Sequence, residues 1–211
     1  MKNIKNELQD IITGDGKTSE NCLIKRLQVY LGGNEIPGHQ NQQVQRLQSE
    51  ETRSLIEFIE INGFFYEDSI EDFNLIGEGA EQKVYRLNDE SLIKLNDRIF
   101  YEFWRDYLNS LLIHNYFFKS TCYELLGFKL IDEKLFAVVK QKFIRSTESV
   151  NLELVREFLE FNDFSNIRNN DYRNETLGLI FEDLHDENII SQDGILFFID
   201  TIFYITDNFY K

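Results

Sequence analysis

The stretch FEDLHDENIISQDGILFFID, residues 181–200, brings together side chains that can bind metals and move protons. Asp183 and Asn188 lie five residues apart after an apolar run, and Asp200 ends a second apolar run twelve residues later. Asp183 could orient an attacking hydroxyl or accept its proton, while Asn188 and Asp200 could offer oxygen ligands to Mg²⁺. This order of residue types predicts a phosphoryl-transfer centre. The alternative is a loop of helix caps and Asx turns, which acidic loops often are.

A glycine-containing turn and a strand lysine earlier in the chain could supply the phosphate-binding half of such a centre. Gly77 and Gly79 lie between two β-like runs, where backbone amides can approach a phosphate without interference from a Cβ atom. Lys94, in the run SLIKL one hairpin later, could reach phosphate oxygens under that turn. Each feature alone has a simpler explanation, a tight hairpin for the glycines and a solvent-facing strand position for the lysine. An acidic partner for Lys94 is expected on the following helix, with Glu102 the first choice and Asp106 the second.

The apolar patterns predict an α+β chain that holds these residues. Residues 1–65 are predicted to be helical, in three helices with a linker or turn at LGGNEIPGHQN, and the third helix has an apolar stripe only in its second half. From residue 73 to 144 the predicted order is β-β-β-α-β-β, in which the helix covers residues 96–118 and Asp132 and Glu133 form a turn. A helix over 149–161, a polar loop over 162–175 and short strands around the opening motif complete the chain.

The net charge of −15 constrains the partners of the protein. Phosphate backbones and acidic lipids repel such a surface, so nonspecific binding to nucleic acid or to an anionic membrane is not expected. All of the excess negative charge follows residue 50, because residues 1–50 hold six Lys/Arg and six Asp/Glu. No apolar run near the N-terminus could serve as a signal peptide or membrane span, and the two cysteines form no disulfide framework or metal signature. A cytoplasmic location is expected.

The motifs GEGAEQKVY, SLIKL, EDLHDENII and FFID, in this order, resemble the protein-kinase-like fold. They are most similar to the kinase domains of polyvalent proteins from bacterial mobile elements and phages, over roughly residues 55–205. The resemblance implies a two-lobe fold with a five-stranded antiparallel N-lobe sheet and a truncated C-lobe, preceded by N-terminal helices. The domains expected on this basis are an N-terminal helical extension over 1–65, an N-lobe over 66–144 and a minimal C-lobe over 145–211.

The resemblance also implies a role for each site residue, with ATP and Mg²⁺ as cofactors. Asp183 is the catalytic residue, Asn188 and Asp200 hold Mg²⁺, and Lys94 contacts the α- and β-phosphates. The other residues expected to bind the nucleotide, or to support Lys94, come from the glycine turn, the strand after it, the helix and the hinge around 140–143: Gly77, Gly79, Val84, Glu102, Gln141 and Phe143.

Several positions depart from the kinase pattern. His185 stands two residues after Asp183, where protein kinases commonly have a lysine, so DLHDEN also resembles the loop of aminoglycoside and choline phosphotransferases. His185 could contact the γ-phosphate when protonated, or it could bond to the loop backbone. Gln82 replaces the third glycine of the phosphate loop, and Thr201 follows Asp200 in place of phenylalanine. Only 11 residues follow Asp200, so no platform for a peptide substrate is expected unless the N-terminal helices or a protein partner complete the C-lobe.

Two classes of function follow from these features. The first is an ATP- and Mg²⁺-dependent phosphotransferase whose acceptor is a protein Ser, Thr or Tyr, or a small molecule. A basic acceptor is favoured because the acidic part of the chain would attract cations. The second is a catalytically silent module that acts through its surface. The joint presence of Lys94, Asp183, Asn188 and Asp200 favours the enzyme, because a binding scaffold does not need all four.

Overall fold

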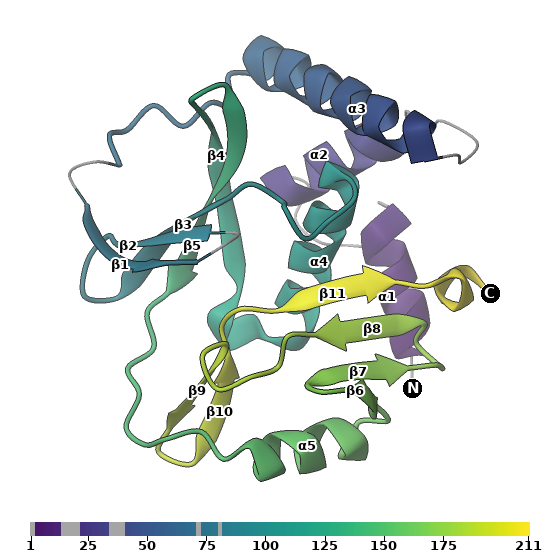
Figure 1. The fold of residues 1–211 in the computed structure, drawn as a ribbon, viewed down its shortest axis with the longest axis vertical. Coiled ribbons are helices and arrows are strands. Elements are labelled where there is room, and N and C mark those ends of the chain that lie inside the picture. Colours follow the sequence, from purple (N-terminus) through teal and green to yellow (C-terminus); the bar gives the residue numbers. More distant parts are fainter. Residues whose placement is uncertain (1–2, 14–21, 34–40, 71–72, 80–81) are drawn as a thin grey trace. The chain divides into compact units, whose positions relative to one another are not determined.

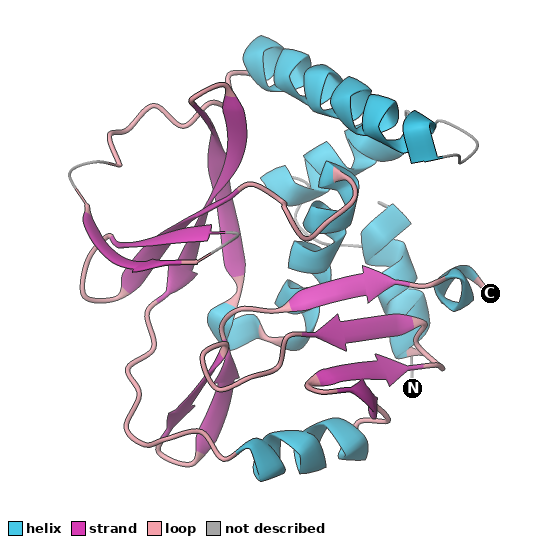
Figure 2. Cartoon of the chain, in the orientation of Figure 1, coloured by secondary structure: helices cyan, strands magenta, loops and turns pink. Residues whose placement is uncertain are grey.

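The computed structural model describes residues 3–13, 22–33, 41–70, 73–79 and 82–211, and it divides the chain into two compact units. We call residues 18–108 and 123–143 the Lys94 unit, and residues 1–17, 109–122 and 144–211 the Asp183 unit. Figure 2 shows helices and strands in both units, so the α+β class predicted from the sequence is confirmed. None of the described helices is both long enough and apolar enough to cross a membrane.

A five-stranded antiparallel sheet forms the centre of the Lys94 unit, as predicted, with the strand order β1-β2-β3-β5-β4 (Figure 1). The bounds of its strands and of the two helices that precede it are: α2 Leu23–Gly32, α3 Asn41–Asn62, β1 Asn74–Glu78, β2 Gln82–Arg86, β3 Ser91–Asn96, β4 Tyr123–Ile131 and β5 Lys134–Lys142. The turn between β4 and β5 is formed by Asp132 and Glu133, both with positive φ (49° and 63°). Such angles at both central residues match the twist of a two-residue hairpin.

Alternation along β3 separates the two faces of this sheet. Ile93 and Leu95 are buried in a cluster with Ile70 and Val138, while Lys94 between them points to the opposite face. Complete burial of an aliphatic side chain contributes about 1.5–3 kcal/mol, and a shift of one residue in register would turn the whole set to the wrong face. The apolar residues of β3 therefore fix the face on which Lys94 lies.

The helix after β3 is shorter than predicted, which corrects the position of Glu102. The helix α4 (Trp104–Phe117) begins eight residues after the predicted start at residue 96, so Glu102 lies in the turn before it. The carboxylate of Glu51 accepts hydrogen bonds from the Trp104 and Arg105 N–H groups at 2.8 and 3.2 Å. These are two of the donors that every helix start leaves unpaired, and a negative charge is favourable there. A residue more than 50 positions away thus sets where this helix begins.

The Asp183 unit contains a four-stranded antiparallel sheet, of order β11-β8-β7-β6, and a separate hairpin of β9 and β10 (Figure 1). α4 continues into this unit. The bounds of its other elements, with η for a 3₁₀ helix, are: α1 Ile4–Thr13, η1 Lys119–Thr121, α5 Leu152–Phe161, β6 Ser165–Arg168, β7 Asp171–Asn174, β8 Leu179–Glu182, β9 Ile189–Gln192, β10 Ile195–Phe198, β11 Ile202–Ile205 and η2 Asp207–Tyr210. The predicted helix and short strands of this part are therefore confirmed.

The prediction of a polar loop over residues 162–175 is wrong, because this segment forms the β6–β7 hairpin. Arg168 pairs with Asp171 across a two-residue turn in which Asn169 has a positive φ of 44°. All four β6 residues are exposed, so the strand has no alternation of apolar and polar side chains that would reveal it. Pairing with β7, which in turn pairs with β8, places this hairpin at the edge of the sheet.

Aromatic side chains form the centre of the Asp183 unit. Phe181 on β8 stacks on Phe203 of β11 with ring centroids 4.1 Å apart, and Phe118 stacks on Phe198 of β10 at 4.6 Å. Phe181, Phe198 and Phe203 are each at most 2% exposed. Because Phe181 and Phe198 each precede a predicted site aspartate by two residues, this aromatic core fixes the strand ends from which both aspartates extend.

Candidate functional site

Three of the predicted nucleotide-binding residues of the Lys94 unit, Gly77, Val84 and Lys94, share one row of the five-stranded sheet. Gly77 pairs with Val84, Val84 with Lys94, and Lys94 with Val139, so the row crosses β1, β2, β3 and β5. Residues directly opposite each other in a sheet point to the same face. Gln141, two residues after Val139 on β5, also belongs to that face. The structure therefore brings Gly77, Val84, Lys94 and Gln141 to one side of the sheet.

Lys94 is almost completely buried on this face, with 3% of its surface exposed. Its Nζ atom lies 5.4 Å from the centroid of the Tyr123 ring, within the range of a cation–π contact. Tyr123 is the β4 residue opposite Gln141, and both are also buried. A lysine enclosed in this way differs from the solvent-facing strand lysine that was the simpler interpretation of its position.

The remaining predicted residues of this unit have contacts of their own. The Gly79 N–H donates to the Gln82 carbonyl at 2.9 Å, which closes the turn between β1 and β2. Phe143 donates its N–H to Glu90 at 2.8 Å, and the Arg86 guanidinium lies 3.7 Å from the centre of its ring. Phe143 thus fastens the end of β5 to the β2–β3 hairpin.

Of the two acidic candidates for pairing with Lys94, Asp106 has a clear structural role. Its carboxylate accepts the Phe103 N–H at 3.2 Å and so caps the start of α4. Burial raises the pKa of Asp106, although this hydrogen bond acts in the opposite direction. The Glu102 side chain is exposed, and its carbonyl accepts a hydrogen bond from Arg98 at 2.9 Å. The pairing of Lys94 with Glu102 stays a prediction.

In the Asp183 unit, three predicted residues lie within hydrogen-bond distance of one another. The Asn188 amide nitrogen donates to both the carbonyl and the Oδ2 atom of Asp183, at 2.8 Å each. His185 Nε2 lies 3.2 Å from Asp183 Oδ1. The Glu187 N–H donates to His185 Nδ1 at 3.3 Å, so Nε2, which also lies 3.2 Å from Asn188 Nδ2, is the ring atom left to donate to Asp183. Both oxygens of the Asp183 carboxylate are thus oriented by neighbours in the loop.

The backbone at Asp183 is held in an uncommon conformation by the tip of the β6–β7 hairpin. Asp183 has a positive φ of 64°, which costs most residues about 1–2 kcal/mol and, among residues other than glycine, is best tolerated by Asp and Asn. The Asp183 N–H donates to the carboxylate of Asp171, and the Leu184 N–H donates to the carbonyl of Asn170, both at 3.2 Å. Burial raises the pKa of the adjacent Glu182, and the carboxylates of Asp171 and Asp183 raise it further. Asp171 is not among the residues predicted for the site, and the only local signal for it is the Asn-Asn turn before it.

Asp200 is joined to the same loop through the backbone. The carbonyl of Asn188 accepts the N–H groups of Ile199 and Asp200 at 3.0 and 3.3 Å. On the other side of Asp200, the Thr201 hydroxyl bonds to His114 Nδ1 at 2.7 Å. His114 is fully buried, and its Nε2 donates to the Thr121 carbonyl at 2.8 Å, so this histidine is a structural core residue that anchors the segment.

These contacts fit the oxygen ligands of a hard cation such as Mg²⁺. The NH₂ group of Asn188 donates to Asp183, so Oδ1 is the side-chain atom of Asn188 that can bind a cation. The Asp200 N–H donates to the Asn188 carbonyl, which joins Asp200 to the same loop. Mg²⁺ needs only one or two protein ligands when water and phosphate oxygens complete its octahedron. Within the ranges that the structure describes, no group of three or more His, Cys, Asp or Glu side chains could hold a metal ion. Asn188 and Asp200 are thus the residues of this loop that could hold such a cation.

Loss of the Asp171 carboxylate is expected to loosen the backbone at Asp183. We expect Asp171→Ala to lower the free energy of unfolding by about 1–2 kcal/mol, because the Asp183 N–H loses a charged acceptor. Amide hydrogen exchange at Asp183 should become faster. Asp171→Asn should restore most of the loss, since it keeps an acceptor and removes a charge next to Glu182. Asp186→Ala, at an exposed position of the same loop, serves as the control. Equal losses for Asp171→Asn and Asp171→Ala would contradict this role.

One comparison with known proteins gave a match. A family model described as "Serine/Threonine/Tyrosine Kinase found in polyvalent proteins" matches residues 48–207, well over half of the chain. The matched range contains every predicted site residue from Gly77 to Asp200. The comparison with curated proteins and the comparison with solved structures each found no match.

Proposed function

The chain belongs to the family of serine/threonine/tyrosine kinases found in polyvalent proteins, and we propose that it transfers the γ-phosphate of ATP, with Mg²⁺, to a hydroxyl group of a protein. A kinase-type phosphotransferase is the function that the family supports. The family match confirms the resemblance that the sequence motifs indicated. The observation that best supports ATP and Mg²⁺ chemistry is the set of hydrogen bonds that joins Asp183, Asn188 and the backbone of Asp200.

Asp183 is the group that we propose to act on the acceptor. Its carboxylate orients the acceptor hydroxyl and takes its proton as the hydroxyl oxygen bonds to the γ-phosphorus. The bond from that phosphorus to the bridging oxygen of ADP breaks, and the electron pair leaves with ADP. Asn188 keeps one carboxylate oxygen in place and His185 the other, so the carboxylate needs little reorganisation before the reaction.

Asn188 and Asp200 are the proposed metal ligands. When bound, Mg²⁺ would neutralise part of the charge on the phosphate oxygens. The protein would hold the two ligand residues in one loop. The hydrogen bond from the Asp200 N–H to the Asn188 carbonyl supports this role.

The face of the sheet that carries Lys94 is the proposed site for the nucleotide. Gly77 and Gly79 would approach the phosphates through their backbone, Lys94 would pair with phosphate oxygens, and Val84 would contact the base or sugar. Gln141 and Phe143 belong to the segment proposed to meet adenine. A two-lobe protein-kinase-like fold is part of this proposal.

A small-molecule acceptor is the second candidate, and the contact between His185 and Asp183 is the observation that favours it. The DLHDEN loop is similar to that of small-molecule phosphotransferases, and His185 Nε2 lies beside the carboxylate that would receive the acceptor. Assays with basic protein acceptors and with aminoglycosides or choline distinguish the two candidates. Transfer to small molecules alone would exclude a protein kinase, and transfer to neither would favour the silent module.

Binding of ATP with Mg²⁺ tests the proposal before any acceptor is known. At ATP concentrations about 100-fold above its dissociation constant, stabilisation by about 2.7 kcal/mol is expected, a rise of roughly 5–10 °C in melting temperature for a chain of this size. The rise should require Mg²⁺ and should be lost in Asp200→Ala but kept in the control Asp186→Ala. A rise that Asp200→Ala leaves intact would contradict the assignment of the metal ligand. Absence of any rise would favour a silent scaffold.

A further inference from the structure

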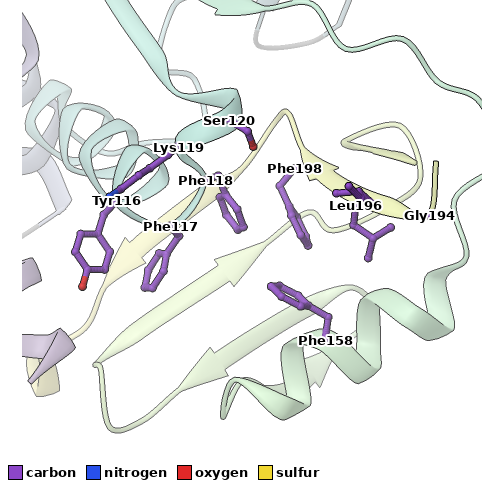
Figure 3. Close-up of a pocket in the computed structure, with 10 residues that line it drawn as sticks. Tyr116, Phe117, Phe118, Lys119, Ser120, Phe158, Gly194, Leu196 and Phe198 are labelled. Atoms are coloured by element: carbon purple, nitrogen blue, oxygen red, sulfur yellow. The ribbon is translucent and has the colours of Figure 1, made fainter. Parts of the chain in front are cut away.

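An open groove of about 640 Å³ lies within the Asp183 unit, outside the residues assigned to catalysis. Figure 3 shows its lining residues, which come from three elements that are far apart in the sequence. They are the segment 116–120 at the end of α4 and in η1, Phe158 of α5, and the β9–β10 hairpin at 194–196 and Phe198. Aromatic and aliphatic side chains dominate this lining, and among the described lining residues only Lys119 is charged.

The groove has a rigid floor and an exposed rim. On the floor, Phe198 is 2% exposed and stacks on Phe118 at 4.6 Å between ring centroids. At the rim, Phe158 lies 5.6 Å from the Phe198 ring and is 43% exposed, and Ile195 is 58% exposed. Concave sites with a buried aromatic floor and accessible apolar edges are typical of surfaces that receive a partner's side chains.

The helix α5 extends this apolar surface beyond the groove. Val155 and Leu159 form its buried face. A second stripe, at positions i, i+4 and i+7, faces solvent, with Leu154 51%, Phe158 43% and Phe161 88% exposed. One apolar face is enough to attach a surface helix to its domain. The second face, which meets the groove at Phe158, is an exposed apolar stripe that the attachment of α5 does not require.

The acidic residues around this surface favour a basic partner. Residues 109–122 and 144–211 of the Asp183 unit carry 14 Asp/Glu and 6 Lys/Arg, and one of these basic residues, Lys119, lines the groove. On α5, Glu153, Glu157 and Glu160 are exposed, and the only basic residue, Arg156, bonds to Glu153 at 2.5 Å and lies 3.9 Å from Glu160. A second copy of the chain would bring like charges together, whereas a basic segment would be attracted.

We propose that this groove docks a segment of a partner protein that carries two or three bulky apolar side chains flanked by Lys or Arg. The apolar side chains would enter the groove over Phe198 and pack against Phe158 and Ile195, and the basic residues would lie near the acidic residues of α5. The proposal goes beyond phosphoryl transfer and does not depend on it, because docking requires neither ATP nor catalysis.

Selection from a random peptide library tests the proposal even while the partner is unidentified. The full chain is immobilised, displayed dodecapeptides are selected on it, and enriched peptides are synthesised with a fluorophore for polarisation measurements. Enriched peptides should combine bulky apolar residues with Lys or Arg. Their dissociation constants should rise at least tenfold in Phe158→Ser and in Ile195→Ser, and they should also rise with salt concentration. Ile61→Ser, at a helix position of the other unit that is 84% exposed, should leave them unchanged.

Three outcomes of the peptide experiments would overturn the proposal. They are the absence of enriched peptides, enrichment of acidic peptides, and binding that neither Phe158→Ser nor Ile195→Ser weakens. The use of two variants at exposed positions protects the test against a folding defect in one of them, which circular dichroism would reveal. Light scattering provides a further check, because a dimer of the wild type that Phe158→Ser converts to a monomer would make a second copy the occupant.

Discussion

Phosphoryl transfer should fall by about a thousandfold in Asp183→Asn, while stabilisation by ATP and Mg²⁺ persists. General base catalysis by a positioned side chain typically contributes about 10²–10⁴-fold, and asparagine cannot accept the acceptor's proton. Asparagine is preferable to alanine here because Asp183 has a φ of +64°, a conformation that Asp and Asn tolerate better than other residues. It also keeps an oxygen that can accept the hydrogen bond from Asn188. The substitution therefore removes the charge with little change in the loop geometry.

Turnover and thermal stabilisation should be measured in the same preparations of wild type, Asp183→Asn and Asp186→Asn. Asp186 is an exposed acidic residue three positions further along the loop, and its substitution should change neither quantity. If Asp183→Asn retained turnover within a few-fold of the wild type, Asp183 could not be the base. If it instead lost stabilisation by ATP and Mg²⁺, Asp183 would belong to the metal site rather than act on the acceptor.

The sheet that carries Lys94 was predictable because its information is local. Alternation of apolar residues in SLIKL predicts a strand, and the glycine-containing turn and the Asp132-Glu133 turn mark its neighbours. Once the strands pair as consecutive hairpins, Gly77, Val84 and Lys94 fall into one row. The shared row of these three residues therefore follows from pattern and connectivity, whereas their roles in nucleotide binding are implied by the resemblance.

The start of α4 could not be predicted in the same way. Residues 97–103 have helix-compatible apolar spacing, yet Arg98 has a φ of +60° and its N–H bonds to the Asn96 side chain at 2.7 Å. The N–H groups at the helix start are capped by Glu51 on α3. No local pattern indicates a cap that comes from another helix, so the prediction that Glu102 lies on this helix was wrong.

The contact that holds the Asp183 backbone could not be predicted either, because it also comes from another segment of the chain. Asp171 follows an Asn-Asn turn in a polar segment, and nothing in its neighbourhood suggests that it accepts the Asp183 N–H twelve residues later. Glu148 gives a second example. It accepts the Ser191 hydroxyl and the Gly194 N–H at 2.8 and 2.7 Å, which lowers its pKa and fastens the β9–β10 hairpin. Sequence patterns predicted the strands that lead to the site, whereas the contacts that hold its loops depend on pairing between segments.

The largest loss of stability from a single added methyl group is expected at Gly178, between β7 and β8. Gly178 has a φ of +70°, its N–H donates to Asn174 at 2.9 Å, and its carbonyl accepts the Thr206 N–H at 2.9 Å. A Cβ atom at this position would collide with the backbone of Phe209, at 2.5 Å from its Cα. Phe209 is fully buried and its carbonyl accepts a hydrogen bond from Gln9 of α1, so it cannot move away without disturbing η2 and α1. We expect Gly178→Ala to cost about 3 kcal/mol or more.

Gly194→Ala shows the cost of backbone strain without a steric collision, and therefore serves as the control for Gly178→Ala. Gly194 has a similar φ of +78°, but no heavy atom beyond its two chain neighbours lies within 4 Å of the position where its Cβ would be. Its substitution should cost only the roughly 1–2 kcal/mol of a left-handed conformation in alanine. Thermal unfolding should therefore show a fall of at least about 6 °C for Gly178→Ala and a clearly smaller one for Gly194→Ala. If the melting temperature fell equally in both variants, backbone strain alone would account for both losses of stability. The packing of η2 against Gly178 would then contribute little to the stability of the Asp183 unit.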